Sequence, residues 1–261
     1  MKRILTIYLP IAILTLLVSV PFLFPARLIW SGINSYVLKS GAADTIALPG
    51  SAFEINLSNF DGVFWQGSVN IALNKLSMGK LYWEMLPSTW AKGQLGASVT
   101  FKGSFHEFGG LFSSDGEFIQ INHLDGQVGA EAITPFSSAY GLYPDGTLSI
   151  RDINIKFQGR WLTQLTGELL WDGGSIQYRN IDAKATYPLP PLTGILSLIE
   201  SDLALEIMQT EESLIVIEST LQASGWGAVN IYRRFFDLSG KQWLATETAD
   251  DIALTVEQKL W

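Results

Sequence analysis

The sequence predicts an all-β protein: a large, mostly antiparallel sheet, twisted or curled, behind one N-terminal transmembrane helix. Three observations support this prediction. Residues 4–26 contain no charged side chain, the rest of the chain repeatedly alternates apolar with polar residues, and Gly-rich breaks separate the alternating runs. Few stretches have helical periodicity, so little chain is left for the crossover helices of a parallel sheet. A β-sandwich is the alternative architecture.

Residues 1–27 are the predicted cytoplasmic start and membrane anchor. About 20 apolar residues in a helix span the hydrocarbon core of a bilayer, and the uncharged run over 4–26 is long enough. Lys2 and Arg3 precede the run, so the positive-inside rule favours a cytoplasmic N-terminus. A cleaved signal peptide is the alternative, although its apolar region is usually shorter and ends at small residues. Both interpretations place the rest of the chain outside the cytoplasm.

Residues 28–50 are the predicted juxtamembrane connector, and residues 51–261 are the predicted β domain. Within that domain, apolar residues occupy every second position in several short runs, which places them on one face of each expected strand. These runs are 53–57, 69–73, 95–101, 148–150, 153–157, 203–207 and 252–256. A further run, 214–217, is apolar throughout and suits a strand that is buried on both faces.

Turns are predicted where Asp precedes Gly, because Gly adopts the positive φ angles of tight hairpins. Such steps occur at 61–62, 115–116, 125–126, 145–146 and 172–173. Helical turns are expected only over 134–140, 192–202 and 231–237, and residues 187–191 read as a polyproline-like connector. One element recurs, first as Gly79-Lys80-Leu81-Tyr82-Trp83-Glu84 and later as Gly167-Glu168-Leu169-Leu170-Trp171-Asp172. The recurrence fits either two similar halves or chance.

The composition narrows the classes of function. A hydrophobic content of 48% with 16% charged residues argues against disorder. The net charge is −8, and it is more negative for the β domain once Lys2, Arg3 and Arg27 beside the apolar run are set apart, so nucleic acid and anionic headgroups are poor partners for that domain. The chain contains no cysteine. Disulfides, thiol chemistry and the acylated cysteine of a lipoprotein are therefore excluded.

We expect no enzyme activity, no cofactor and no metal site, and we nominate no catalytic, cofactor-binding or metal-ligating residue. The two histidines, His106 and His123, are too few for a zinc site of three or four ligands. A glycosidase pair could come only from carboxylates that mostly precede Gly and therefore suit turns, namely Asp61, Asp115, Asp125, Asp145, Asp152 and Asp172. Large aromatics in strands suit a core better than an exposed row, and these are Trp65, Trp83, Trp161 and Trp171.

The layout resembles the type II secretion system protein N family. The matching stretches are Gly62-Val63-Phe64-Trp65-Gln66-Gly67, then 76–87 with its Gly79-x-Leu81-x-Trp83, and in the second half 145–148 and 165–171. The resemblance covers nearly the whole chain and is weakest after about residue 180. It rests on Gly and Trp positions that look architectural, so it implies no catalytic residue.

The resemblance implies a single-pass accessory or scaffold component of the bacterial inner membrane, with its bulk in the periplasm. Such a component would support the export of folded periplasmic proteins across the outer membrane of Gram-negative bacteria, with other inner-membrane components as its partners. The alternative is a periplasmic, membrane-anchored lipid-binding or lipid-transfer protein of the AsmA-like type. A lipid carrier would have a continuous apolar groove, whereas a scaffold would fill that face with its own side chains.

Overall fold

The computed structural model describes residues 25–27, 45–47, 54–74, 76–138, 141–159, 161–180, 183–238, 240 and 248–259. These residues are mostly in strands, which confirms the predicted all-β class. Within these ranges no helix has the length and apolar character needed to cross a membrane. The predicted anchor over 4–26 lies outside them except for Pro25 and Ala26, and most of the predicted connector over 28–50 lies outside them as well.

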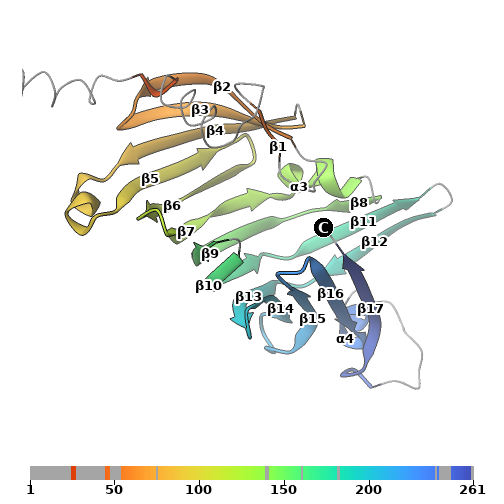
Figure 1. Ribbon diagram of the computed structural model, residues 1–261. Coiled ribbons are helices and arrows are strands. Elements are labelled where there is room, and N and C mark those ends of the chain that lie inside the picture. The colour runs from red at the N-terminus through yellow and green to blue at the C-terminus, as the bar shows by residue number, and fades with distance from the viewer. Residues whose placement is uncertain are drawn as a thin grey trace, which may run out of the picture.

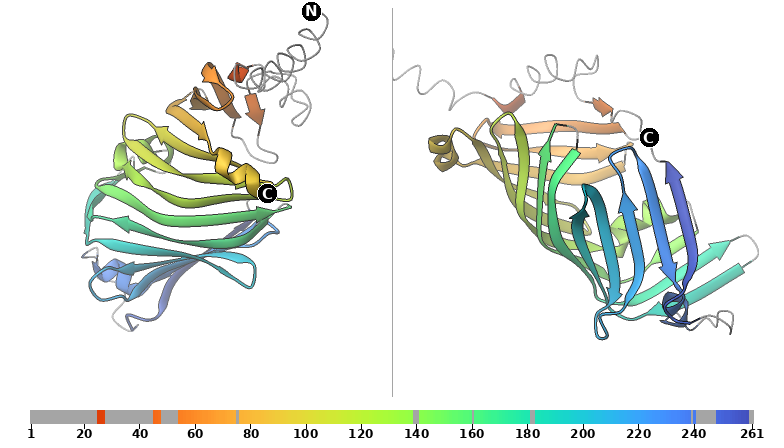
Figure 2. Two further views of the ribbon diagram at one scale, coloured as in Figure 1. Left: turned by 90° about the vertical axis from the view of Figure 1, so that its left-hand side faces the viewer. Right: turned by 60° about the horizontal axis from the view of Figure 1, so that its bottom comes forward.

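Fourteen strands form one antiparallel sheet that curls without closing, as Figures 1 and 2 show. Neighbouring strands are mostly consecutive in the chain, so the sheet is a long meander. In order across the sheet, the strands are β1 (Thr45–Ala47), β2 (Glu54–Val63), β3 (Gln66–Leu73), β4 (Leu76–Met85), β5 (Leu95–Lys102), β6 (His106–Ser114), β7 (Phe118–Gly129), β9 (Thr147–Gln158), β10 (Trp161–Trp171), β13 (Leu192–Ile199), β14 (Asp202–Gln209), β15 (Ile215–Leu221), β16 (Trp226–Tyr232) and β17 (Ile252–Lys259).

A second sheet of three strands extends from one end of the large sheet (Figure 1). It contains β8 (Leu142–Pro144), β11 (Gly174–Asn180) and β12 (Ala183–Leu189). Only Asp172 and Gly173 separate β10 from β11, and only two prolines separate β12 from β13. Gly173 and Gly174 have φ angles of 90° and 141°, which side chains disfavour. The chain therefore bends here, and the predicted polyproline-like connector over 187–191 was wrong for residues 187–189, which belong to β12.

Helices are few and short: η2 (Pro87–Lys92), α3 (Ala130–Ser137) and α4 (Arg233–Leu238). α3 contacts β7 and β8, and α4 contacts β15 and β16. Two predicted helical stretches overlap α3 and α4. The helix predicted over 192–202 was wrong, because Leu192–Ile199 forms β13. Apolar residues occur on both faces of this strand, and their mixture imitates a helical period.

Bulges explain where the sequence alternation changes phase. β9 carries apolar residues at 148 and 150 and then at 153, 155 and 157, and Asp152 in the gap has a φ of 43°. β7 has its own irregularity, where His123 has a φ of 50°. Bulges increase the local twist and bend of a strand. They therefore help the sheet to curl, and what looked like two runs is one continuous strand.

Two of the Asp-Gly steps, at 115–116 and 145–146, lie in turns as predicted. The step at 125–126 lies inside β7 and the step at 61–62 inside β2, so neither is a hairpin turn. The step at 172–173 is the bend between β10 and β11. In the run 214–217, Val216 is fully buried, but Leu214 is 45% exposed, so burial on both faces applies only to part of that run.

The core lies at the centre of the large sheet. Its buried members, Ile153, Leu162 and Leu165, come from β9 and β10. Partly buried leucines and isoleucines from β7, β9, β10, β13 and β14 pack against them. The core is thus built by neighbouring strands of one sheet, and no second sheet packs over it among the described residues.

Candidate functional site

The main functional feature is a continuous apolar face on the large sheet. Residues paired across neighbouring strands lie on the same side of a sheet, so the strand registers trace the face from β2 to β17. We call this side the apolar face. Its rows of paired residues are Leu57–Ile71, Val69–Leu81–Phe101–Phe108, Ala97–Phe112–Ile121–Ile155–Leu165 and Ile150–Leu169–Gly194–Ile207–Ile217–Ile231–Leu254.

The opposite side is mainly polar, and we call it the polar face. Its rows include Ser68–Tyr82–Thr100, Gln120–Lys156–Gln164 and Glu206–Glu218–Asn230–Thr255. Such a division is normal when one face of an antiparallel sheet meets water and the other is covered. Here the described residues supply no second layer to cover the apolar face.

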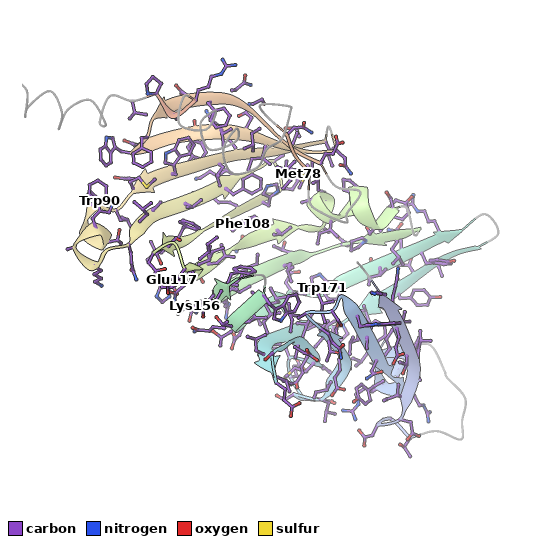
Figure 3. All side chains as sticks on the ribbon, viewed as in Figure 1. Met78, Trp90, Phe108, Glu117, Lys156 and Trp171 are labelled. Atoms are coloured by element: carbon purple, nitrogen blue, oxygen red, sulfur yellow. The ribbon has the colours of Figure 1, made fainter. Side chains whose placement is uncertain are left out.

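Exposure of the side chains shows how open this face is. Most of its large aliphatic and aromatic residues are only half-buried, and Phe108 and Trp171 among them are labelled in Figure 3. Ile119 and its cross-strand partner Phe157 are 46% and 38% exposed, and Val256 is 48% exposed. Complete burial of such a side chain contributes about 1.5–3 kcal/mol. The face therefore retains a large hydrophobic driving force for binding.

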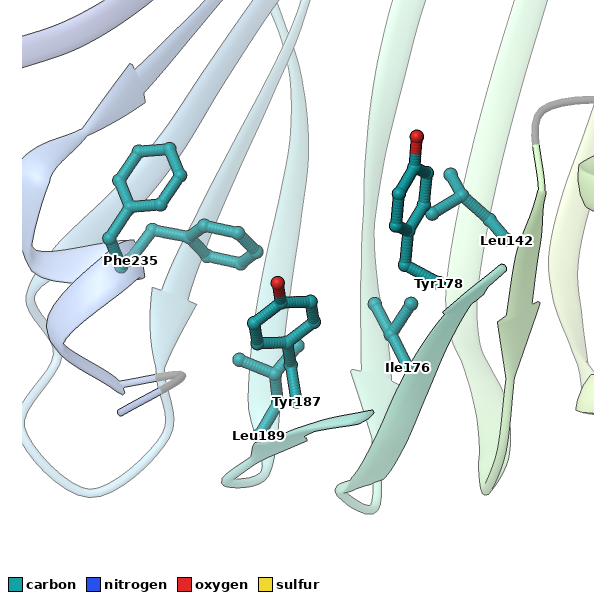
Figure 4. Close-up of a pocket in the computed structure, with 7 residues that line it drawn as sticks. Leu142, Ile176, Tyr178, Tyr187, Leu189 and Phe235 are labelled. Carbon is teal, nitrogen blue, oxygen red and sulfur yellow. The ribbon is translucent and has the colours of Figure 1, made fainter. Parts of the chain in front are cut away.

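A separate apolar pocket of about 300 Å³ lies between the small sheet and α4 (Figure 4). Every residue that lines it is aliphatic or aromatic: Leu142, Ile176, Tyr178, Tyr187, Leu189, Phe235 and Phe236. Cross-strand pairing places Tyr178 beside Leu142 and Ile176 beside Tyr187 on one face of the small sheet. The sequence did not predict this pocket, because its pattern did not indicate β11 and β12 as strands.

The polar residues that were considered for catalysis serve the backbone. His123 Nδ1 lies 2.7 Å from Asp152 Oδ1, and this hydrogen bond lowers the pKa of the Asp152 carboxyl group. The backbone N–H of Asp152 donates to Asp125, and that of His123 donates to Asn154. The cluster thus joins the bulges of β7 and β9. Among the described residues no group of three His, Cys, Asp or Glu side chains could hold a metal ion.

Three further aspartates accept backbone hydrogen bonds at turns. Asp115 accepts from the N–H groups of residues 117 and 118, Asp145 from Gly146, and Asp172 from Thr147. His106 stacks on Phe101 of the apolar face, with ring centroids 4.9 Å apart. The turn geometry that the sequence favoured is thus present at Asp115, Asp145 and Asp172, whereas Asp61 and Asp125 lie inside strands.

The tryptophans anchor strand ends to neighbouring turns. Trp83 Nε1 donates to the Phe64 carbonyl at 3.0 Å, and Trp171 Nε1 donates to the Asp145 carbonyl at 3.0 Å. The glycine four residues before each tryptophan has a positive φ, 134° at Gly79 and 146° at Gly167. The recurring Gly-x-Leu-x-Trp element therefore has the same local structure in both places, although the division into two halves remains a prediction.

Comparison with known proteins identifies the family of this chain. No curated protein and no solved structure gives a significant match. The family model for type II secretion system protein N matches residues 54–251, from β2 to the loop before β17. The match extends well beyond residue 180, where the resemblance in sequence was weakest. The chain therefore belongs to the type II secretion system protein N family and is a component of that secretion system.

Proposed function

We propose that the chain is a single-pass accessory component of the inner-membrane part of the type II secretion system. In this proposal the sheet lies in the periplasm and supports the export of folded proteins across the outer membrane. It acts by binding other components and not by catalysis. Pro25 supports the placement, because it forms an antiparallel bridge with Val63 at the end of β2. A span that ends at Ala26 would hold the sheet directly against the bilayer.

The observation that carries the binding role is the apolar face. It extends across neighbouring strands from β2 to β17, most of its large members are half-buried, and the described residues supply no layer to cover it. A contiguous apolar surface of this kind marks a site of protein or membrane interaction. The polar clusters, in contrast, are occupied by backbone hydrogen bonds, as at Asp145 and Asp172.

The same observation favours a second candidate, binding of lipid. A scaffold with a self-sufficient fold would fill its apolar face with its own side chains, whereas a lipid carrier would leave it open. The open face fits a ligand that offers only apolar surface, such as the acyl chains of a phospholipid. The scaffold role predicts a protein on the apolar face, whereas the lipid-binding role predicts a lipid on that face.

The experiment is a crosslinking pull-down of the full-length protein from native membranes, with proteins and lipids identified by mass spectrometry. Ile119→Asp places a charge on the apolar face, and Leu111→Asp is its matched control on the polar face, since their side chains are 46% and 40% exposed. We expect Ile119→Asp alone to reduce recovery of other secretion components. Phospholipid recovered without such components would refute the scaffold role and support the second candidate.

A further inference from the structure

The outer edge of β17 ends the large sheet without a partner strand among the described residues. On its other side β17 pairs with β16 from Ile252 to Lys259. In an eight-residue antiparallel strand about half of the backbone N–H and C=O groups point away from the paired neighbour. Those groups form a template for a further strand. Every residue of β17 except Ala253 is exposed.

β17 has one register irregularity against β16 and a terminal Lys259, but it lacks three other features that usually protect an edge strand. Such features are shortness, proline and charges on the inward face. The opposite edge strand, β1, has only three residues. β17 has eight residues and no proline, and Leu254 and Val256 on its apolar face are 46% and 48% exposed. One edge of the sheet is therefore short, and the other is long and apolar on one side.

We propose that β17 pairs with β17 of a second copy of this chain in antiparallel orientation. A free strand edge is recognised by another extended backbone, and one apolar face requires a partner with the same alternation. β17 itself meets both requirements. The proposal goes beyond the function proposed above, because self-association depends neither on the membrane anchor nor on the ligand of the apolar face.

The charges and the apolar residues select one register for this pair, centred on Thr255. In that register Leu254 lies opposite Val256 twice, and Thr255 lies opposite its own symmetry mate. Aliphatic pairs and Thr–Thr pairs each stabilise cross-strand neighbours. A register centred on Glu257 would instead place two carboxylates face to face.

The result is a two-fold dimer in which the two large sheets become one. An isolated strand pair buries less surface than the roughly 1,200–2,000 Å² of a typical stable interface. We therefore expect a reversible dimer that covalent capture reveals best. Direct antiparallel partners have Cβ atoms about 4.5–5.5 Å apart, close to the separation that a disulfide requires.

The absence of native cysteine makes the test direct. The full-length Thr255→Cys protein is oxidised with copper phenanthroline in native membranes, and products are resolved without reductant and identified by mass spectrometry. Thr166→Cys is the matched control, because it is also an exposed polar-face threonine but lies on the interior strand β10. We expect at least about tenfold more homodimer from Thr255→Cys than from the control, because only its partner thiol lies directly opposite.

Two further substitutions in the Thr255→Cys protein test the register. Leu254→Lys and Val256→Lys should each reduce the dimer several-fold, whereas Leu111→Lys, at a similarly exposed site on the interior strand β6, should not. Circular dichroism of each purified variant confirms that it folds. Thr255→Cys dimer no greater than the Thr166→Cys control would overturn the proposal. Crosslinking of residue 255 to a different protein would also overturn it, because the edge would then serve another partner.

Discussion

Gly167 provides the sharpest test of how the recurring Gly-x-Leu-x-Trp element holds the sheet together. It lies in β10 with a φ of 146°, a conformation that residues with a side chain rarely adopt. A Cβ atom at this position would lie 2.6 Å from Ile153 Cγ1 and 2.7 Å from its Cα. Because the second contact is with backbone, rotation of the Ile153 side chain cannot relieve the clash. Gly167→Ala should therefore strain both the backbone and the core.

The expected cost follows from these two effects. A residue held in a conformation that is almost exclusive to glycine costs about 1–3 kcal/mol, and overpacking of a core costs about another 1–3 kcal/mol. Gly159 is the matched control, since its φ is also positive, at 67°, but no atom lies within 4 Å of an added Cβ. Gly159→Ala should therefore cost only about 1 kcal/mol.

The assay is thermal unfolding of the full-length protein in mild detergent, followed by tryptophan fluorescence. One kcal/mol corresponds to a shift of about 2–4 °C in Tm for a chain of this size. We expect Gly167→Ala to lower Tm by roughly 4–24 °C and Gly159→Ala by about 2–4 °C. Equal shifts would refute the argument, because the crowded contact with Ile153 would then contribute nothing.

Three further predictions concern stability. Trp171→Phe removes the hydrogen bond to the Asp145 carbonyl and should cost about 0.5–1.5 kcal/mol in thermal unfolding. Leu165→Ala empties part of the core and should cost about 2–5 kcal/mol in the same measurement. The bond from His123 lowers the pKa of Asp152, so its stabilising effect is complete above the usual value of 3.8 and is lost as pH falls through the lower folded-state pKa. Melts at decreasing pH should accordingly show a smaller acid-induced loss for Asp152→Asn than for the unaltered protein.

Much of the fold could be predicted because alternation reports directly on a sheet with one apolar face. The runs at 69–73, 95–101 and 203–207 lie in β3, β5 and β14 as expected. Prediction failed where apolar residues on the second face of a strand obscured the alternation. Leu192–Ile199 looked helical because Ile195 and Ile199 add apolar residues on the other face, and only pairing with β10 and β14 reveals the strand.

The candidate site was only partly predictable for a related reason. The alternation identified which residues share a face within one strand, but the register between strands decides whether those faces join. That register depends on bulges such as those at His123 and Asp152, where a local hydrogen bond and a positive φ shift the phase. The pocket beside Phe235 depends on the bend at Gly173, which appeared in the sequence only as a turn.

The meander order of the large sheet has a consequence for how the chain reaches its native state. Each strand pairs with the one before it, except where β8 and the β11–β12 hairpin intervene, so a partner is always already present when the next strand is synthesised. Local pairing of this kind keeps loop closure inexpensive in entropy and favours rapid folding. The sheet can thus grow strand by strand from its N-terminal end, without waiting for a distant segment to complete it.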